Sequence, residues 1–484
     1  MTETAWIFVV VLGVSFGLGA IAARFVHNAS DYYVAGARIP WYLLTGTFLA
    51  SNVSAGLFLG ATNMTGQHGY AIWSAYFTTN IGFFLAIAVV GVLIRRLADH
   101  YEIYNFGDIL ATRYSSRAGA VRAVTAVFLP VIYIPLLAAQ FIAMSTIAAT
   151  TLGLPYEETL AAIVLLVIAY TVLGGMIGVV WSDGFQFLVL IVGLLIAVPI
   201  GMTVLGGGDP SAGWQQLRAL PEDMFQWTSA SWPWYLAAAQ LVWIFAIPAQ
   251  PHLVTRFLAA KDERAILISL PVCALFGLII YASTVPLGLI GHVTFPELTD
   301  GEYYYIQIAR QYLGPWLGAI ALAGVTAAAL STSSTIMIVA GQSLSRDFYQ
   351  KFFHPSANRK TVLFVARFSV FVVGACGFSI AHLQFLDIFW LAVLSASLLA
   401  SVYFVPLMGG LFWKSAGGDG AIAAMISGGL AAVVVFAVNE IMDTRLFISE
   451  FFAGLCISII AMWLATRRKR ATSAEMAAWA CMRN

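Results

Sequence analysis

Residues 39–64 read IPWYLLTGTFLASNVSAGLFLGATNM, and this stretch decides the fold. It is long enough to cross a bilayer, but its middle, ASNVSAG at 50–56, holds small and polar residues where a lipid-facing helix would carry Leu or Ile. Backbone at membrane depth leaves helical geometry only where it is buried in protein or lines a watery cavity. We therefore predict a helix break at 50–56 whose freed carbonyls and hydroxyls face an ion and a solute. The alternative is a continuous helix whose small residues let a neighbour pack closely.

The composition of the whole chain indicates a membrane setting. Of the 484 residues, 61% are hydrophobic and 10% are charged, whereas a soluble globular protein carries roughly 25% charged residues. The mean hydropathy is +0.87. We expect an all-α integral membrane protein, multi-pass in the cell inner (plasma) membrane. The four cysteines are scattered and form neither a metal-binding spacing nor a disulfide framework.

Thirteen apolar runs are long enough to span the membrane. They lie near residues 5–24, 40–63, 70–94, 121–149, 156–177, 182–205, 232–251, 265–293, 314–343, 360–382, 385–411, 419–438 and 446–466. With the N-terminus outside, only Arg218, Arg310 and Arg445 of the 24 basic residues fall on the outer side, and Arg256 counts among the inner connections. Because cytoplasmic connections collect Lys and Arg, this alternation predicts thirteen transmembrane helices, N-terminus out and C-terminus in.

A second polar cluster, VTAAALSTSST, lies at 325–335 inside the ninth span. Ser331 and Thr332 are adjacent, and Ser334 and Thr335 follow one turn later on overlapping faces. Hydroxyls and carbonyls are hard neutral oxygen donors, so a site built from them suits sodium. The alternative is that these hydroxyls bond back to the preceding helical turn and loosen the packing.

The seventh span, at 232–251, is a third irregular place. Pro248 and Pro251 cannot continue a regular helix, because each lacks an N–H donor and crowds the turn before it. This span comes five spans after the interrupted second one, and paired broken helices in two halves of a chain indicate a carrier site at the midplane. Trp243 and Phe245 precede the break; they either form the wall of a solute pocket or pack as ordinary core aromatics.

The acidic residues and histidines lie away from the middle of the spans. Only Asp183 and Asp387 fall outside clear connections, and both sit at span ends. A proton-driven carrier would usually place a carboxylate or His inside the membrane, and a haem-bearing membrane enzyme needs facing His ligands there. The sequence therefore argues against both classes, and we expect no enzyme.

Four passages together resemble a known family. They are DYYVAGARIPW at 31–41, YTVLGGMIGVVWSDGFQ at 170–186, QPHLVTRFLAAKDERAI at 250–266 and VTAAALSTSST at 325–335. In order and spacing they are similar to segments of the sodium/solute symporters, which include sodium-coupled proline, pantothenate, sugar and sialic-acid carriers. Gly174–Gly175 followed by Trp181–Ser182–Asp183 is the most specific part of the match.

The resemblance implies a LeuT-like core of five plus five helices in inverted repeat, with discontinuous helices. Residues 1–30 would form an extra N-terminal transmembrane helix, 31–205 the first repeat (spans 2–6) and 206–411 the second (spans 7–11). Residues 412–466 would add two C-terminal helices, followed by a cytoplasmic tail at 467–484.

The resemblance also implies where ions bind. A sodium ion would be held by the carbonyls of Ala50, Val53 and Ala328 and the hydroxyls of Ser331 and Thr332. Some members of the family are thought to use a second sodium ion, and the matching residues are Asp183, Ser334 and Thr335. Sodium is the only metal ion expected.

The solute site departs from the family pattern. The proline branch has an aspartate where this chain has Asn52, a tryptophan at Gly56 and a tyrosine at Ile247, while Trp243 is kept. Sugar carriers place Gln and Glu at Leu57 and Tyr76. The full set of expected solute-binding residues is Asn52, Ser54, Gly56, Leu57, Tyr76, Tyr133, Gln140, Trp243 and Ile247, of which Tyr133 and Gln140 could hydrogen-bond a solute carboxylate.

We expect a sodium-coupled symporter that imports a small organic solute by alternating access, either an amino acid such as proline or a small monocarboxylate. A sodium/sugar symporter is one alternative. A transporter-like sensor that works with a separate signalling partner is another, and a channel is a third. The expected partners are sodium, the solute and the lipid bilayer, without nucleic acid, and a monomer would suffice.

Overall fold

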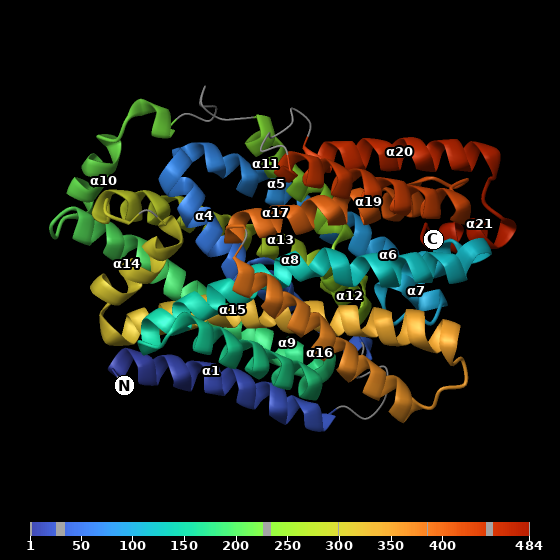
Figure 1. The fold of residues 1–484 in the computed structure, drawn as a ribbon, viewed down its shortest axis with the longest axis horizontal. Coiled ribbons are helices and arrows are strands. Elements are labelled where there is room, and N and C mark those ends of the chain that lie inside the picture. Colours follow the sequence, from blue (N-terminus) through green and yellow to red (C-terminus); the bar gives the residue numbers. More distant parts are fainter. Residues whose placement is uncertain are drawn as a thin grey trace.

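The computed structural model describes residues 2–25, 34–225, 234–298, 300–384, 386–441 and 449–483. Within these ranges every regular element is a helix, and the helices form one elongated bundle with the two chain ends at opposite ends (Figure 1). Ten helices of the described part are long and apolar enough to cross a membrane. The predicted all-α membrane class is thus confirmed, whereas the count of thirteen spans and their orientation remain predictions.

The first half of the chain contains the first broken helix. Its elements are α1 (Glu3–Ala22), α3 (Trp41–Asn52), α4 (Ala55–His68), α5 (Trp73–Phe84), the π-helical η4 (Leu85–Gly91), α6 (Val92–His100), α7 (Phe106–Arg113), α8 (Ala118–Leu152) and α9 (Tyr156–Leu205). The predicted second span is the pair α3 and α4, and the predicted third span covers α5, η4 and α6. The short helix α7 lies in the connection between the third and fourth predicted spans.

The second half repeats the pattern of a broken helix followed by long ones. It contains α10 (Pro210–Arg218), α11 (Trp234–Ala246), η7 (Ile247–Ala249), α12 (Pro251–Ala259), α13 (Glu263–Thr294), η8 (Gly301–Tyr303), α14 (Tyr304–Tyr312), α15 (Gly314–Gln342) with its π-helical continuation η9 (Ser343–Phe353), α16 (Arg359–Leu383), α17 (Ile388–Leu399), the π-helical η10 (Ala400–Phe404) and α18 (Val405–Phe412). The chain ends with α19 (Gly418–Ile441), α20 (Glu450–Arg468) and the short α21 (Ser473–Cys481).

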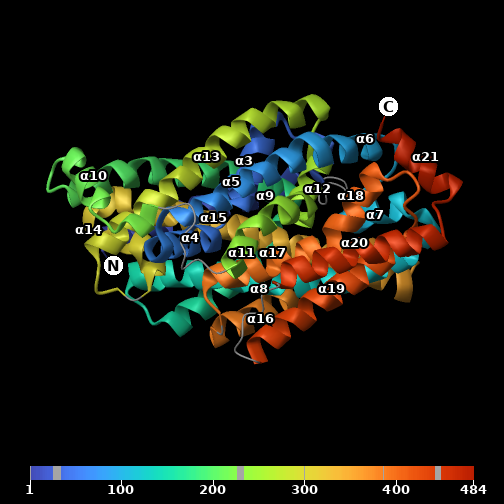
Figure 2. The same ribbon diagram turned by 90° about the horizontal axis from the view of Figure 1, so that it is seen from above.

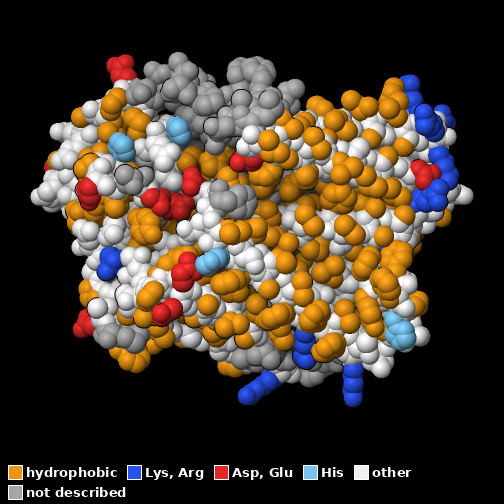
Figure 3. Space-filling model, in the orientation of Figure 1, with side chains coloured by type: hydrophobic (Ala, Val, Ile, Leu, Met, Phe, Trp, Pro, Cys, Tyr) orange, Lys and Arg blue, Asp and Glu red, His pale blue; other side chains and the backbone are white. Residues whose placement is uncertain are grey.

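Charged side chains distinguish the two ends of the bundle. On the face in Figure 3, Lys and Arg gather mainly at the end that holds the C-terminus, and Asp and Glu mainly at the other, with apolar side chains between. We call the first the basic end, marked by Arg96, Lys414 and Arg468, and the second the acidic end, marked by Asp209 and Glu302. This separation is the pattern expected of a protein whose apolar middle lies in a bilayer.

The long element α9 covers two predicted spans, 156–177 and 182–205. Helix α9 starts at the acidic end, just after α8 has reached it. Near the other end of α9, Gly201 packs against Ile290, which lies close to the end of α13 at the acidic end. A straight helix of this length would extend about 75 Å. Both ends of α9 therefore lie at the acidic end, and its two halves run in opposite directions.

The first broken helix is held in the centre of the bundle. Half-helix α3 packs against α9, α13 and α15, as the turned view in Figure 2 also shows. Where α3 crosses α9, a Cβ added to Gly46 would lie 3.4 Å from the Cα of Gly184. Two glycines at this crossing let the backbones approach closely, which brings the polar end of α3 against the polar residues of α9 and α15.

Candidate functional site

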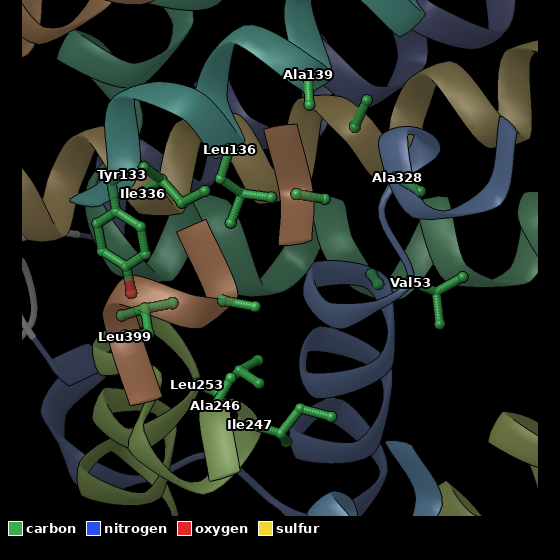
Figure 4. Close-up of a cluster of buried hydrophobic side chains, with 14 of the residues drawn as sticks. Val53, Tyr133, Leu136, Ala139, Ala246, Ile247, Leu253, Ala328, Ile336 and Leu399 are labelled. Atoms are coloured by element: carbon green, nitrogen blue, oxygen red, sulfur yellow. The ribbon is translucent and has the colours of Figure 1, made fainter. Parts of the chain in front are cut away.

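The first helix break lies at Val53 and Ser54. Half-helix α3 ends at Asn52, Val53 has φ −81° and ψ 78°, and α4 starts at Ala55. The amide of Ser54 donates to the carbonyl of Asn52 (3.0 Å), so it does not bond to the carbonyl of Ala50 as it would in a continuous helix. Figure 4 shows Val53 at the link between the two half-helices, with Ala328 near the same link. The predicted break at 50–56 is present but narrower, and the continuous-helix alternative is wrong.

Helix α15 places its hydroxyls against this break. The hydroxyl of Thr332 lies 3.1 Å from the carbonyl of Ser51 and 3.1 Å from that of Ala328. The hydroxyls of Ser51 and Ser331 are 2.9 Å apart. All of these residues are buried. The structure thus brings the end of α3 together with Ala328, Ser331 and Thr332, the α15 residues expected for the sodium ion.

The alternative reading of the hydroxyl cluster is also partly realised. Ser334 and Thr335 both donate to the carbonyl of Ser331, at 3.0 and 2.9 Å, which is the back-bonding pattern of hydroxyl residues in helices. Thr332 combines such a contact with one across to α3. Only Ser331 and Thr332, the first half of the cluster, therefore link α15 to α3 through their hydroxyls.

An ion pair lies beside the break, which the sequence reasoning did not foresee. Nη2 of Arg256, on α12, lies 3.2 Å from Oδ2 of Asp183, on α9, and 3.1 Å from the hydroxyl of Thr335. The side chains of Arg256 and Asp183 are 0% and 1% exposed. The sequence interpretation placed Arg256 in an inner connection and Asp183 at a span end; the structure shows both side chains buried inside the bundle and paired with each other.

The guanidinium group of Arg256 also binds the first broken helix. Its Nε donates to the hydroxyl of Thr47 (2.9 Å), and Nη2 bonds to the hydroxyl of Ser51. Nη1 bonds to the carbonyl of His252. The hydroxyls of Thr47 and Ser51 in turn contact Oδ2 of Asp183. A buried charge is tolerated when it is paired and its hydrogen bonds are satisfied, and this network meets both conditions for the guanidinium.

The second helix break lies between α11 and α12. The chain passes through the short η7 and then Gln250, which has extended geometry (φ −72°, ψ 111°), before Pro251 starts α12. This is the interruption that Pro248 and Pro251 predicted. Where α12 ends, Ile39 pairs with the strand-like backbone around Ala260: its N–H donates to Ala259 (3.0 Å), and its carbonyl accepts from Lys261 (2.9 Å). The first and second broken helices are therefore joined on the basic-end side of their breaks.

A small cavity lies between the two breaks. Its volume is about 20 Å³, and its lining comprises Ser51, Asn52, Ser54, Leu136, Trp243, Gln250, His252, Thr332 and Ala392. The indole N–H of Trp243 is buried without a hydrogen-bond partner among the described residues. A water molecule needs roughly 10–15 Å³ by this measure. The cavity as it stands therefore holds about one water or one ion, and a larger solute requires the helices to move apart.

The predicted solute-binding residues divide into three groups. Asn52, Ser54 and Trp243 line the cavity. Tyr133, Gln140 and Ile247 are buried nearby without lining it. The side chains of Gly56, Leu57 and Tyr76 lie outside the described residues. Of the two aromatics before the second break, Trp243 lines the cavity, whereas Phe245 packs against Phe404 and Phe451.

The sequence reasoning missed three polar side chains around the cavity. Gln250 and His252 line it. The ring Nδ1 of His252 lies 2.8 Å from the hydroxyl of Tyr133. The amide Nδ2 of Asn52 donates to the hydroxyl of Tyr281 on α13 (3.1 Å). Gln250 and His252 flank Pro251, so their position beside the predicted break was the signal that could have found them.

Comparisons with known proteins agree with this arrangement. The model of the sodium:solute symporter family matches residues 32–428. The sodium/proline symporter of Haemophilus influenzae is 26% identical over 96% of this chain and 93% of its own length. The sodium/pantothenate symporter of Escherichia coli is 25% identical over 89% of this chain and 90% of its own.

Solved structures share the fold. A sodium-coupled sialic acid symporter in a substrate-bound outward-open state superposes with a TM-score of 0.80 at 18% identity, covering 98% of this chain and 99% of that one. A nucleobase-cation-symport-1 family transporter in a closed conformation gives a TM-score of 0.56 at 14% identity, over 94% and 99% of the two chains.

Proposed function

The chain belongs to the sodium:solute symporter family, and from this premise we propose that it imports a small organic solute together with sodium by alternating access. Sodium is the coupling ion in this family. The proposed solute is an amino acid such as proline or a small monocarboxylate, and the proposed location is the inner (plasma) membrane with the basic end in the cytoplasm. The relatives named above are sodium/proline and sodium/pantothenate symporters, which supports a small carboxylate-bearing solute.

We propose that sodium binds at the break of α3, held by the carbonyls of Ala50, Val53 and Ala328 and the hydroxyls of Ser331 and Thr332. One observation carries this proposal: the hydroxyls of Ser331 and Thr332 already reach across to Ser51 at the end of α3. An ion that replaces these hydroxyl contacts would bind α3 and α15 at once. Binding would thus order the break and fix the position of the first half-helix against α15.

We also propose a second sodium ion at Asp183, Ser334 and Thr335. Oδ2 of Asp183 already faces the guanidinium group of Arg256, which also contacts Thr335. The other carboxylate oxygen, Oδ1, has no hydrogen-bond partner among the described residues. A second sodium ion would therefore bind on the Oδ1 side, or after Arg256 has moved away.

The proposed solute position is the cavity between the two breaks. Asn52, Ser54 and Trp243 line it, and the indole N–H of Trp243, which has no hydrogen-bond partner in the described part of the chain, offers a donor to a solute carboxylate. The remaining candidates, Gly56, Leu57, Tyr76, Tyr133, Gln140 and Ile247, would contact the solute once the helices have separated. In each proposed repeat, 31–205 and 206–411, a broken helix precedes the long helices, which supports their division.

Uptake into proteoliposomes tests the function. We expect saturable uptake of proline or of a small monocarboxylate, driven by an inward sodium gradient and lost when potassium replaces sodium. The melting temperature of the purified protein should rise with sodium and rise further with the solute only when sodium is present, because a ligand of the folded state stabilises it by mass action. Uptake that ignores the sodium gradient would indicate a channel, and sodium-dependent stabilisation by sugars alone would indicate a sugar symporter. Co-purification with a kinase and no uptake would indicate a sensor.

A further inference from the structure

Two buried N–H donors lie at the cavity between the two helix breaks. The first is the indole N–H of Trp243, whose side chain is 6% exposed and whose N–H has no hydrogen-bond partner in the part of the chain that the structure describes. A buried donor without a partner costs free energy until a ligand or a water accepts from it. Because Trp243 lines the cavity, a solute bound there can supply the missing acceptor.

The second donor is the imidazole of His252, whose protonation is set by Tyr133. The hydroxyl oxygen of Tyr133 lies 3.1 Å from the main-chain nitrogen of His252 and 2.8 Å from its ring Nδ1. The main-chain N–H can only donate, so the hydroxyl oxygen accepts from it. Within the described residues, Nδ1 is the only acceptor left for the hydroxyl proton. The imidazole is therefore neutral, with its own N–H at Nε2.

The surroundings of His252 agree with a neutral ring that donates. Nη1 of Arg256 bonds to the carbonyl of His252, and a positive charge this close disfavours a second one on the imidazole. The ring lies beside the carbonyl of Ser51 at the end of α3, and it lines the cavity. The N–H at Nε2 can therefore donate either to that carbonyl or to an oxygen of the solute.

The cavity offers no carboxylate to a cationic group of a solute. None of its described lining side chains is acidic, and the only titratable one is the neutral His252. Residues 55–57 and 71–76, whose side chains lie outside the described part, contain no acid or base in the sequence. Beside the first break, Arg256 and Asp183 pair at 3.2 Å, so their charges cancel. The lining and this ion pair together carry no net charge.

Sodium at its proposed site would add one positive charge next to the solute. Thr332 belongs both to that proposed ion site and to the lining of the cavity, so the ion and the solute would be close neighbours. In a buried site of low dielectric constant, opposite charges attract strongly and an uncompensated charge is costly. A monoanionic solute balances the sodium ion. A zwitterion has no net charge to balance it, and its ammonium group would lie near sodium without an acidic partner.

We propose that the solute is a small monocarboxylate without an amino group, and that the N–H groups of Trp243 and His252 donate to its carboxylate. Tyr133 is a positioning residue, since it fixes which nitrogen of the imidazole carries the proton. Leu136 and Ala392 form the apolar part of the lining, which suits a short hydrocarbon group. This inference rests on the proposed sodium symport and narrows its solute to one of the two proposed classes.

Asn52 is the position that selects against an ammonium group. It lines the cavity at the end of α3, and its amide Nδ2 donates to the hydroxyl of Tyr281 (3.1 Å). A carboxylate at this position would add a negative charge beside the sodium ion and would give an ammonium group its counter-charge. Asn52→Asp should therefore move the preference of the protein from monocarboxylates toward amino acids.

Ligand-dependent melting of the purified full-length protein measures this preference with two matched pairs of probes. Propionate is compared with alanine, and cyclopentanecarboxylate with proline, because the members of each pair differ only by a positively charged nitrogen. Each probe is titrated in sodium and again in potassium. In sodium, we expect the two carboxylates to stabilise the wild type at concentrations at least about tenfold lower than the two amino acids.

Three variants test the residues. Asn52→Asp should abolish or reverse the preference within each pair. Trp243→Phe removes the indole donor and Tyr133→Phe the hydroxyl that fixes the imidazole, and each should weaken the response to the carboxylates about tenfold while stabilisation by sodium alone remains. Tyr305→Phe is the matched control, because its hydroxyl donates to the main chain of α15 (3.2 Å) and it does not line the cavity. It should respond like the wild type.

The outcomes separate this inference from the proposed symport. A sodium-dependent preference for alanine and proline would overturn the inference and leave the symport intact. A preference for the carboxylates that is equal in sodium and in potassium would support the solute class and contradict sodium coupling. A response to none of the four probes, or an unchanged preference in Asn52→Asp, would also overturn the inference. The melting temperature of each variant in sodium alone establishes that it is folded.

Discussion

Side chains from three helices meet at the guanidinium group of Arg256. Its partners are Thr47 and Ser51 on α3, Asp183 on α9 and Thr335 on α15. Helices α3 and α15 also carry the residues of the proposed ion site, and α9 packs against α3. Arg256 therefore links the broken helices to the long helices around them, and its pairing decides how firmly the centre of the bundle is held.

The first prediction concerns this ion pair. Arg256→Gln and Asp183→Asn, made separately, should each lower the melting temperature strongly, because removing one partner of a buried pair leaves an uncompensated charge at a cost of about 3–5 kcal/mol. The double variant should recover much of the loss, since both charges are then absent. Thermal unfolding of the detergent-solubilised protein measures all three. Additive losses in the double variant would show that the two side chains do not stabilise each other.

The second prediction concerns the hydroxyls of α15. Ser331→Ala and Thr332→Ala should each raise the sodium concentration for half-maximal uptake about tenfold, because losing one oxygen ligand costs about 1–2 kcal/mol. Maximal uptake should change little. Thr326→Ala is the matched control, since Thr326 lies on the same helix and only bonds back to Leu322 (2.9 Å). Unchanged sodium dependence in both test variants would place the ion elsewhere.

At the scale of elements, the helix breaks were the predictable part of the site. Small and polar residues at 50–56 and the prolines at 248 and 251 are local signals, because each acts on its own stretch of backbone. The partnership of Arg256 with Asp183 was not predictable in this way. The two residues are 73 positions apart, and each alone resembles an ordinary charge at a span end. Only the packing of α12 against α3 and α15, and of α3 against α9, brings them together and buries them.

The contact between η8 and α17 carries a pH-dependent group at the acidic end. Glu302 is buried, and its Oε1 accepts a hydrogen bond from the N–H of Ile388 at the start of α17 (3.0 Å). Burial, with nearby Asp300, raises the pKa of Glu302 to about 8 from its ordinary value of 4.5. The folded state thus binds the proton more tightly than the unfolded state. The contribution of Glu302 is most favourable below pH 4.5 and is lost as pH rises toward about 8.

The third prediction follows from this titration. As the pH rises from 4.5 to about 8, hydrogen exchange at the amides of Ile388 and its neighbours should increase beyond the intrinsic pH effect and then level off, because ionised Glu302 is disfavoured in its buried position. Glu302→Gln should remove the excess, and Glu297→Gln, which replaces an exposed acid in the same loop region, should not. An equal pH response in wild type and Glu302→Gln would exclude Glu302 as the titrating group.

At the scale of the whole molecule, the short helix α21 fastens several elements at the basic end. Glu475 accepts hydrogen bonds from Ser116 (2.7 Å) and from the N–H of Gly418 (3.1 Å). The side chain of Arg483 donates to the carbonyl of Leu411 on α18 (3.0 Å). These contacts join α21 and the residues after it to the segment before α8, to α18 and to the start of α19.

The fourth prediction is that truncation after Arg470 loosens this end without unfolding the bundle. Hydrogen exchange in α6 and α18 should rise and the melting temperature should fall by a few degrees, because surface contacts are lost while the apolar packing of the long helices remains. Glu475→Ala, which removes two of the contacts, should have a smaller effect in the same direction. Exchange identical to that of the full chain would show that α21 rests on the surface without supporting it.

The short backbone bridge between Ile39 and Ala260 has a consequence for solute release. Two hydrogen bonds tie the strand-like segment before α3 to the one after α12, so a movement of one half-helix away from the middle of the bundle either pulls the other with it or breaks these bonds. The half-helices α3 and α12 are therefore expected to move together. If the proposed transport opens a passage at the basic end, the two half-helices would move together to open it, and a crosslink that immobilises one of them would hold the other in place.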